Sequence, residues 1–130
     1  MGSAGLRYGL KTDRFSSHSQ IARWLQDFKR LMMPGHPCVV YDIGCAQGLL
    51  GQLLDPDVFL VFGVDSDPVA LRQAGPNYRQ ALCADIESTA SFGFAELPDV
   101  LVLADVLEHT REPEECLRRL SWFKRKGWPS

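Results

Sequence analysis

The sequence has no apolar run that approaches the ~20 residues needed to cross a bilayer. Its opening stretch, MGSAGLRYGLKTDR, also lacks the apolar core of a secretory signal. We therefore expect a cytoplasmic protein with no membrane-spanning segment.

No charge of one sign dominates the chain. It has 14 Lys and Arg against 16 Asp and Glu, which gives a formal net charge of -2. A charge this small argues against strong general attraction to nucleic acid or to an anionic membrane. The 130 residues, with 45% hydrophobic content, are enough for one globular domain with a real core.

No two of the 4 cysteines are spaced as C-x-x-C, which argues against a zinc knuckle or a thioredoxin-type motif. His36 and Cys38 could supply two metal ligands, but no second pair follows, so we expect no metal site. Cys38 and Cys83 lie in apolar runs and are predicted to be small buried side chains. Reduced thiols fit the cytoplasm best.

The first predicted element is a helix. Ser17 and Gln20 have the spacing of a capping box, and Pro34-Gly35 is expected to end the helix. Apolar residues recur at helical spacing between these signals, and two of them, Trp24 and Phe28, are expected to lie in the core rather than to form an aromatic cage. The recurring apolar residues are Ile21, Trp24, Leu25, Phe28 and Met32.

Short apolar runs after this helix predict strands that are buried on both faces, with helices between them. The expected strands are 38–43, 58–64, 80–84 and 100–104, and the expected helices begin near residue 49, at Pro68 and at Pro113. This alternation predicts an α/β fold, a Rossmann-like parallel sheet of about four strands with helices on both faces. Ligands of such sheets bind at the carboxyl ends of the strands. Each expected strand ends at or near an aspartate: Asp42, Asp65, Asp85 and Asp105.

The loop after the first strand reads DIGCAQG over residues 42–48. Gly44 and Gly48 remove side chains where the backbone must turn sharply, which would let a ligand approach the main chain. A dinucleotide fold would place the last glycine of G-x-G-x-x-G one residue later, where this chain has Leu49. The spacing favours a nucleoside without a diphosphate. A tight turn with no ligand is the alternative.

Two further strand ends carry candidate ligand contacts. Asp65 could accept two hydrogen bonds from a ribose diol; the alternative is a solvated turn acid, with Asp67 capping the next helix. Asp85 could accept a hydrogen bond from an exocyclic amine such as N6 of adenine, and Ile86 supplies a backbone N–H beside it. The alternative for Asp85 is an exposed loop acid.

Four segments in order resemble the successive motifs of class I S-adenosylmethionine (SAM) dependent methyltransferases. They are VYDIGCAQG (40–48), GVDSDP (63–68), ADI (84–86) and DVLVLADVLEHTREP (99–113). The last is similar to a stretch of the group that methylates small molecules and sugars. The resemblance implies an incomplete class I methyltransferase fold, with an N-terminal arm and helix over 1–36 and a SAM-binding Rossmann-like domain over 37–130. The implied reaction moves the methyl group of SAM to an unidentified small-molecule or sugar acceptor.

The resemblance also implies a role for each candidate residue. Asp42 and the loop to Gly48 would hold the methionine portion of SAM, Asp65 the ribose, and Asp85 with Ile86 the adenine. The end of the fourth strand would meet the amino end of methionine. Position 46 is alanine where the family most often has glycine. The expected cofactor contacts are Asp42, Gly44, Cys45, Ala46, Gly48, Asp65, Ser66, Asp85, Ile86, Ala104 and Asp105.

Methyl transfer asks little of the protein, because the sulfonium already activates the methyl group and the enzyme needs to align the acceptor and exclude water. His109 is the best candidate for a general base, ahead of Asp105 and Glu108, since imidazole titrates near neutrality. A structural role in fixing its loop is the alternative for His109. His18 could close over the cofactor from the N-terminal helix or lie at the surface.

The sheet of this family normally has seven strands, and the sequence supports four. Much of the usual acceptor pocket would then be missing, and the fourth strand would have an exposed edge that a second copy or a partner chain could cover. We therefore expect a methyltransferase that is active once completed, or a non-catalytic SAM-binding domain or truncated remnant. A different nucleotide-binding protein, such as a dehydrogenase fragment, is disfavoured by the loop spacing.

Overall fold

The structure is a computed structural model that describes residues 14–46, 48–86, 92–103, 111, 114, 115 and 118. Its elements follow the order α1 (Arg14–Met32), β1 (Cys38–Ile43), α2 (Leu49–Leu53), β2 (Phe59–Asp65), α3 (Pro68–Ala74), a 3-10 helix η1 (Gly75–Asn77), β3 (Gln80–Cys83) and β4 (Val100–Val102). None of the described helices is long and apolar enough to cross a membrane.

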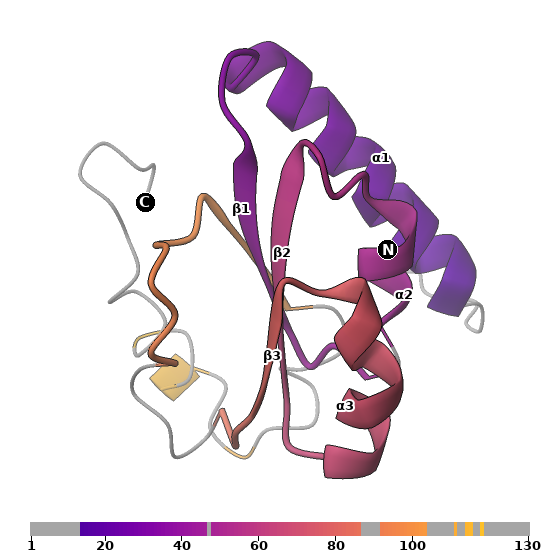
Figure 1. Cartoon of the computed structure of the whole chain (residues 1–130), viewed down its shortest axis with the longest axis vertical. Helices are drawn as coiled ribbons and strands as arrows, with labels where there is room; N and C mark the ends of the chain where they lie inside the picture. Colours follow the sequence, from indigo (N-terminus) through magenta and orange to yellow (C-terminus); the bar gives the residue numbers. More distant parts are fainter. Residues whose placement is uncertain are drawn as a thin grey trace.

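The four strands form one parallel sheet in the order β3-β2-β1-β4, of which Figure 1 labels β1, β2 and β3. All six residues of β1 are buried, as expected for an apolar run at the centre of a parallel sheet. Asp42 of β1 lies in register with Gly63 of β2 and Val102 of β4. The pairing of β4 begins at Asp99, whose carboxylate and backbone N–H bond the backbone of Val39. The predicted α/β fold with a parallel sheet of four strands is confirmed.

The two faces of the sheet carry separate cores, because successive residues of a strand point to opposite sides. The three α-helices lie together on one side of the strands, and residues 92–99 run on the other (Figure 1). The helix-side core contains Ala22, Leu25, Cys38, Val40, Cys45, Leu50, Leu54, Phe59, Val61, Leu71, Ala74, Tyr78 and Val102. The aromatic core, on the other face, contains Val39, Tyr41, Ile43, Phe62, Val64 and Phe92, with Phe94 packed against it.

The predicted flanking helices are confirmed on one face of the sheet. Within the described residues, every α-helix of more than one turn lies on the same side. Residues 114, 115 and 118 are helical, but most of the helix predicted after Pro113 lies outside the described residues.

Helix α1 departs from its prediction in two ways. It already includes Arg14, so Ser17 lies inside the helix and the predicted start at a capping box is wrong. Trp24 is 57% exposed, so its predicted core position is wrong as well. The helix turns Leu25 toward the sheet, while Trp24 stacks on the half-buried Phe28 with ring centroids 5.3 Å apart. The predicted end before Pro34 is confirmed.

The burial predicted for Cys38 and Cys83 is confirmed for the first, in a central strand, and wrong for the second, in an edge strand. Cys38 of β1 is fully buried, as predicted, and its burial raises the pKa of the thiol to about 11. Cys83 of β3 is exposed, so that prediction is wrong. The reason is the sheet order, which places β3 at an edge where an apolar run is covered on one side only.

Candidate functional site

The loop between β1 and α2 turns through three residues with left-handed backbone, Gly44, Ala46 and Gly48, whose φ angles are 77°, 49° and 87°. The backbone N–H groups of Gly44 and Cys45 both donate to the carbonyl of Val64, at 2.7 and 3.0 Å, and so fasten the loop to the end of β2. A left-handed alanine costs roughly 1–2 kcal/mol relative to glycine. Ala46, the one departure from the family pattern in this loop, therefore carries backbone strain.

Asp65, at the carboxyl end of β2, holds this strained residue in place. Its Oδ2 accepts a hydrogen bond from the backbone N–H of Ala46 at 2.8 Å, and its Oδ1 accepts one from the N–H of Asp67 at 2.9 Å. A carboxylate can accept about four hydrogen bonds, so about two acceptor positions remain on the half-buried Asp65. The side chain can thus tie two loops together and still accept bonds from a diol.

Asp67 and Ser66 follow Asp65 in the turn to α3. The side chain of Asp67 accepts a hydrogen bond from the N–H of Val69 at 2.9 Å, which confirms the helix-capping interpretation of this residue. Ser66 is exposed, and its carbonyl accepts a bond from the thiol of Cys83 at 3.6 Å. Asp65 is the member of this turn that bonds the glycine-rich loop.

Asp42 is a buried carboxyl on the helix side of β1, only 1% exposed. Its Oδ2 accepts a hydrogen bond from the hydroxyl of Tyr78 at 2.6 Å, while its Oδ1 is buried without a hydrogen-bond partner among the described residues. Burial raises the pKa of Asp42, and the Tyr78 hydrogen bond and the charge of His18 oppose that rise. An unsatisfied buried carboxyl is costly, which marks Asp42 as a candidate functional residue.

Two neighbours of Asp42 complete its surroundings. His18 of α1 is buried, with 9% of its surface exposed, so the alternative of a surface position is wrong. Cys45 is buried too, and burial together with the charges of Asp42 and Asp65 raises the pKa of its thiol to about 12. The Cys45 thiol therefore stays protonated and fills space rather than acting as a nucleophile.

Tyr78 is the residue that the sequence analysis missed. Its ring lies in a slot between three glycines, because a Cβ atom added at Gly48, Gly51 or Gly63 would meet a ring carbon at 3.1 Å. Glycine inside a helix or a strand is unfavourable and often indicates close approach of another group. Gly51 in α2 and Gly63 in β2 are the signals that pointed to such a partner. Gly48, predicted to admit a ligand, has the Tyr78 ring and Ala74 against its bare Cα.

The remaining candidates are more scattered. Asp85 is exposed just beyond β3, and Ile86 packs at the border of the aromatic core. Ala104, Asp105, Glu108 and His109 lie outside the described residues. The structure thus brings one set of candidates together around the ends of β1 and β2, with Asp85 and Ile86 beyond the neighbouring strand. That set is Asp42, Gly44, Cys45, Ala46, Gly48, Asp65 and Ser66.

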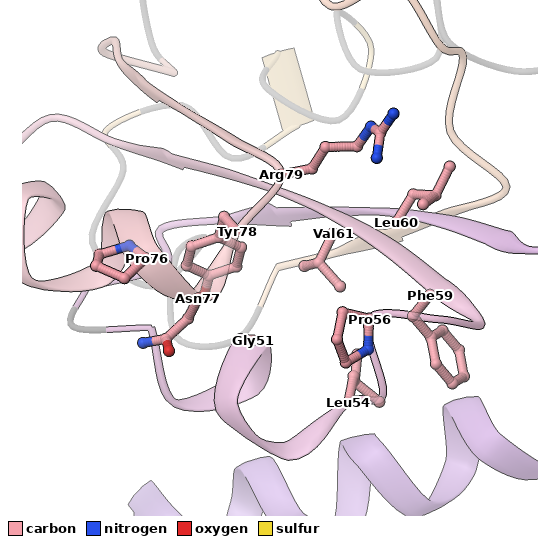
Figure 2. A pocket seen from close by; sticks show the side chains of 10 residues that line it. All are labelled: Gly51, Leu54, Pro56, Phe59, Leu60, Val61, Pro76, Asn77, Tyr78 and Arg79. Atoms are coloured by element: carbon pink, nitrogen blue, oxygen red, sulfur yellow. The ribbon is translucent and has the colours of Figure 1, made fainter.

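A cavity of about 170 Å³ lies elsewhere, between α2 and residues 76–79 (Figure 2). Besides Gly51 of α2 and the segment that follows it, its lining comes from the amino half of β2 and from residues that precede β3, whereas the loop at 44–48 follows the carboxyl end of β1. None of the predicted site residues lines it, although Gly51 and Tyr78 do. The cavity is therefore not the site that the strand ends predict.

The sequence profile of the family described as "Methyltransferase domain" matches residues 41–127, well over half of the chain. The chain belongs to the methyltransferase domain family. The match includes the whole cluster around Asp42 and Asp65. No curated protein matches this methyltransferase domain.

Solved methyltransferase structures resemble the domain in fold. The plantazolicin methyltransferase BpumL in complex with SAH (S-adenosylhomocysteine) superposes with a TM-score of 0.68 at 22% identity, over 86% of this chain and 44% of that one. The CurJ carbon methyltransferase gives a TM-score of 0.65 at 20% identity, over 79% of this chain and 30% of that one. The N-terminal domain of EvdMO1 in the presence of SAH and D-fucose gives 0.64 at 22%, over 81% and 46%. The fold is that of class I methyltransferases, and the chain spans less than half the length of each.

Proposed function

We propose that this methyltransferase domain binds SAM at the carboxyl edge of its sheet and takes part in methyl transfer to a small-molecule acceptor. The observation that carries the proposal is the junction of Asp42, the loop with three left-handed residues, and Asp65 at the ends of two adjacent strands. Two structural relatives, BpumL and the N-terminal domain of EvdMO1, were solved with bound SAH, the demethylated product of SAM, which supports the same ligand class here.

The donor and acceptor groups of this junction fit SAM. Asp42 has a buried oxygen without a described partner, suited to a positively charged methionine portion. Asp65 has acceptor positions left for a ribose diol, and Asp85 with Ile86 would meet the adenine. Bound SAM supplies an activated methyl group, and the protein's share is to orient the two reactants and exclude water. The roles of Ala104 and Asp105 toward methionine, and of His109 as a base, are part of the same proposal.

The class of acceptor is proposed from the structural relatives, and a partner for the sheet is proposed from the pairing of β4. The structure of the EvdMO1 domain was obtained with a sugar, and BpumL was solved with plantazolicin analogues, so we propose a small hydroxylated or peptide-like acceptor. Within the described residues, β4 pairs with β1 alone. We propose that further chain, from a second copy or a partner, adds to β4 and completes the acceptor pocket. A non-catalytic SAM-binding domain is the second candidate.

We also propose a reducing compartment, the cytoplasm, as the place where the domain works. Its three described cysteines are all free, and two of them are buried thiols in the helix-side core. Free thiols persist where the compartment keeps them reduced.

Calorimetric titration of the purified chain with SAM and with SAH tests the proposal, with NAD as a control ligand. We expect both sulfur ligands to bind and NAD to give no heat of binding, because the loop spacing does not suit a pyrophosphate. Circular dichroism establishes that the titrated chain is folded. A folded chain that binds neither SAM nor SAH would refute the proposed function.

A further inference from the structure

Tyr78 touches three parts of the candidate site at once. Its ring is held against the bare backbone of the loop at Gly48, of α2 at Gly51 and of β2 at Gly63. Its hydroxyl donates a hydrogen bond to Oδ2 of Asp42 across 36 residues of sequence. The ring position leaves little freedom, because each of the three glycine faces lies in contact with it. The direction of the hydroxyl is therefore fixed by the packing.

The surroundings of Asp42 contain four titratable groups, each from a different segment. They are His18 from α1, Cys45 from the loop, Asp65 from the end of β2 and Tyr78 from the segment after η1. Burial and the neighbouring Asp42 charge raise the pKa of Tyr78 far above its usual range. Tyr78 is thus a permanent hydroxyl donor, and the Cys45 thiol stays neutral.

One consequence concerns the two oxygens of Asp42. The hydroxyl of Tyr78 donates a hydrogen bond to Oδ2, whereas Oδ1 is buried and has no hydrogen-bond partner among the described residues. Because a donor stabilises the ionised form of a carboxyl, Tyr78 opposes the tendency of burial to keep Asp42 protonated. A cation that binds Oδ1 would then interact with a carboxylate that is already ionised.

We propose that Tyr78 is a positioning residue for SAM binding, which holds Asp42 ionised and turns its free oxygen to the positively charged amino group of the methionine portion. This inference rests on the proposed function, since it assumes that Asp42 meets that portion of the ligand. The inference goes beyond the proposed function because it assigns the selectivity for an amino-acid cation to a residue outside the four motifs.

The competing interpretation is that Tyr78 only fills the core. Tyr78→Phe separates the two, because it keeps the ring in its glycine slot and removes the hydroxyl alone. The chain also offers a matched control. Tyr41, on the other face of the sheet, is a second buried tyrosine whose hydroxyl donates to the carbonyl of Glu96. Tyr41→Phe deletes a comparable hydrogen bond without touching Asp42.

The test is the affinity of the full chain for SAH, measured over a pH series from about pH 5 to pH 8, because burial raises the pKa of Asp42. An ammonium binds the ionised carboxylate, so affinity falls as the pH drops through the pKa of Asp42. Loss of the hydroxyl raises that pKa further. We expect Tyr78→Phe to bind SAH about 10-fold more weakly near neutrality, the loss typical of a hydrogen bond to a charged group, and to lose affinity at higher pH than the wild type.

Tyr41→Phe should keep the wild-type affinity and pH profile. His18 is unchanged in the wild type and in both variants. A shift of the pH profile that appears only in Tyr78→Phe is therefore due to loss of the Tyr78–Asp42 hydrogen bond. A Tyr78→Phe protein with the wild-type profile would overturn the inference, whereas a wild type that binds no SAH at any pH would instead overturn the proposed function.

A second variant serves if Tyr78→Phe does not fold. Asp42→Asn keeps an oxygen that can accept the Tyr78 hydroxyl but cannot ionise. We expect it to bind SAH at least about 10-fold more weakly and without the fall in affinity at low pH that the wild type shows. Wild-type affinity of Asp42→Asn would likewise overturn the inference.

Discussion

The two faces of the central strand use a buried tyrosine in opposite ways. Tyr41 lies in the aromatic core, with ring centroids 5.1 Å from Phe94 and 5.7 Å from Phe62, and its hydroxyl bonds a loop carbonyl. Tyr78 lies in the helix-side core, among glycines, and its hydroxyl bonds the carboxyl of Asp42. Tyr41 is surrounded by large side chains and Tyr78 by bare backbone. The comparison indicates that the aromatic face mainly stabilises the domain and that the helix face builds the site.

Phe62→Ala should have the largest effect and should act on stability alone. Phe62 is fully buried between the rings of Tyr41 and Phe94, so truncation leaves a cavity that costs about 3–5 kcal/mol of unfolding free energy. Chemical denaturation measures the loss. Leu31→Ala is the control, because Leu31 is 68% exposed and should change stability by less than about 0.5 kcal/mol. Weaker SAH binding by the folded fraction of Phe62→Ala would contradict the assignment of stability to the aromatic face and of binding to the helix face.

Asp65→Ala should act mainly on binding. The variant loses the acceptor for the Ala46 N–H and the proposed acceptor for the ribose, and we expect SAH affinity to fall by about 1.5–3 kcal/mol, measured by calorimetry. Asp67→Ala is the matched control, since Asp67 also accepts a backbone N–H but caps α3. It should cost about 1 kcal/mol of stability and leave SAH affinity unchanged. Equal affinities for the two variants would remove Asp65 from the site.

Gly51→Ala tests the glycine slot on the helix face. The new Cβ would lie 2.6 Å from the backbone oxygen of Asn77 and 3.1 Å from the Tyr78 ring, so Tyr78 must move. We expect a loss of about 1–3 kcal/mol of stability together with weaker SAH binding. Gly75→Ala is the control, because no atom lies within 4 Å of its Cβ position. A Gly51→Ala protein that is destabilised but binds SAH normally would argue that the slot serves packing only.

Ala46→Gly should have the smallest effect, in the stabilising direction. Ala46 has a φ of 49°, which glycine adopts without steric cost, so thermal unfolding should give about 1 kcal/mol more stability. Ala81→Gly, at an exposed position of β3, should lower stability instead. If Ala46→Gly is also destabilising, the strain ascribed to this loop is absent.

Local signals predicted most of the elements. The bounds Cys38–Ile43 and the helix start at Pro68 match the predictions, because an apolar run between glycines defines the first and an aspartate cap before Pro68 defines the second. The exposure of Trp24 could not be predicted, since helical spacing does not reveal which side of a wide apolar stripe meets the sheet. The role of Tyr78 could not be predicted from the sequence either. Its partner Asp42 lies 36 residues away, and only the sheet brings the two together.

The pairing of β1 with β4 has a consequence for the order of folding. The bond between Val39 and Asp99 joins residues 60 positions apart, whereas β1 and β2 are adjacent both in the chain and in the sheet. During synthesis the first crossover can form as soon as residue 65 has left the ribosome, but the second edge of β1 stays open until residue 102 follows. Closing so long a loop is slow, and an open central edge attracts foreign strands in the meantime. The nascent domain is therefore most prone to aggregate over that interval, and a chaperone that covers β1 would act there.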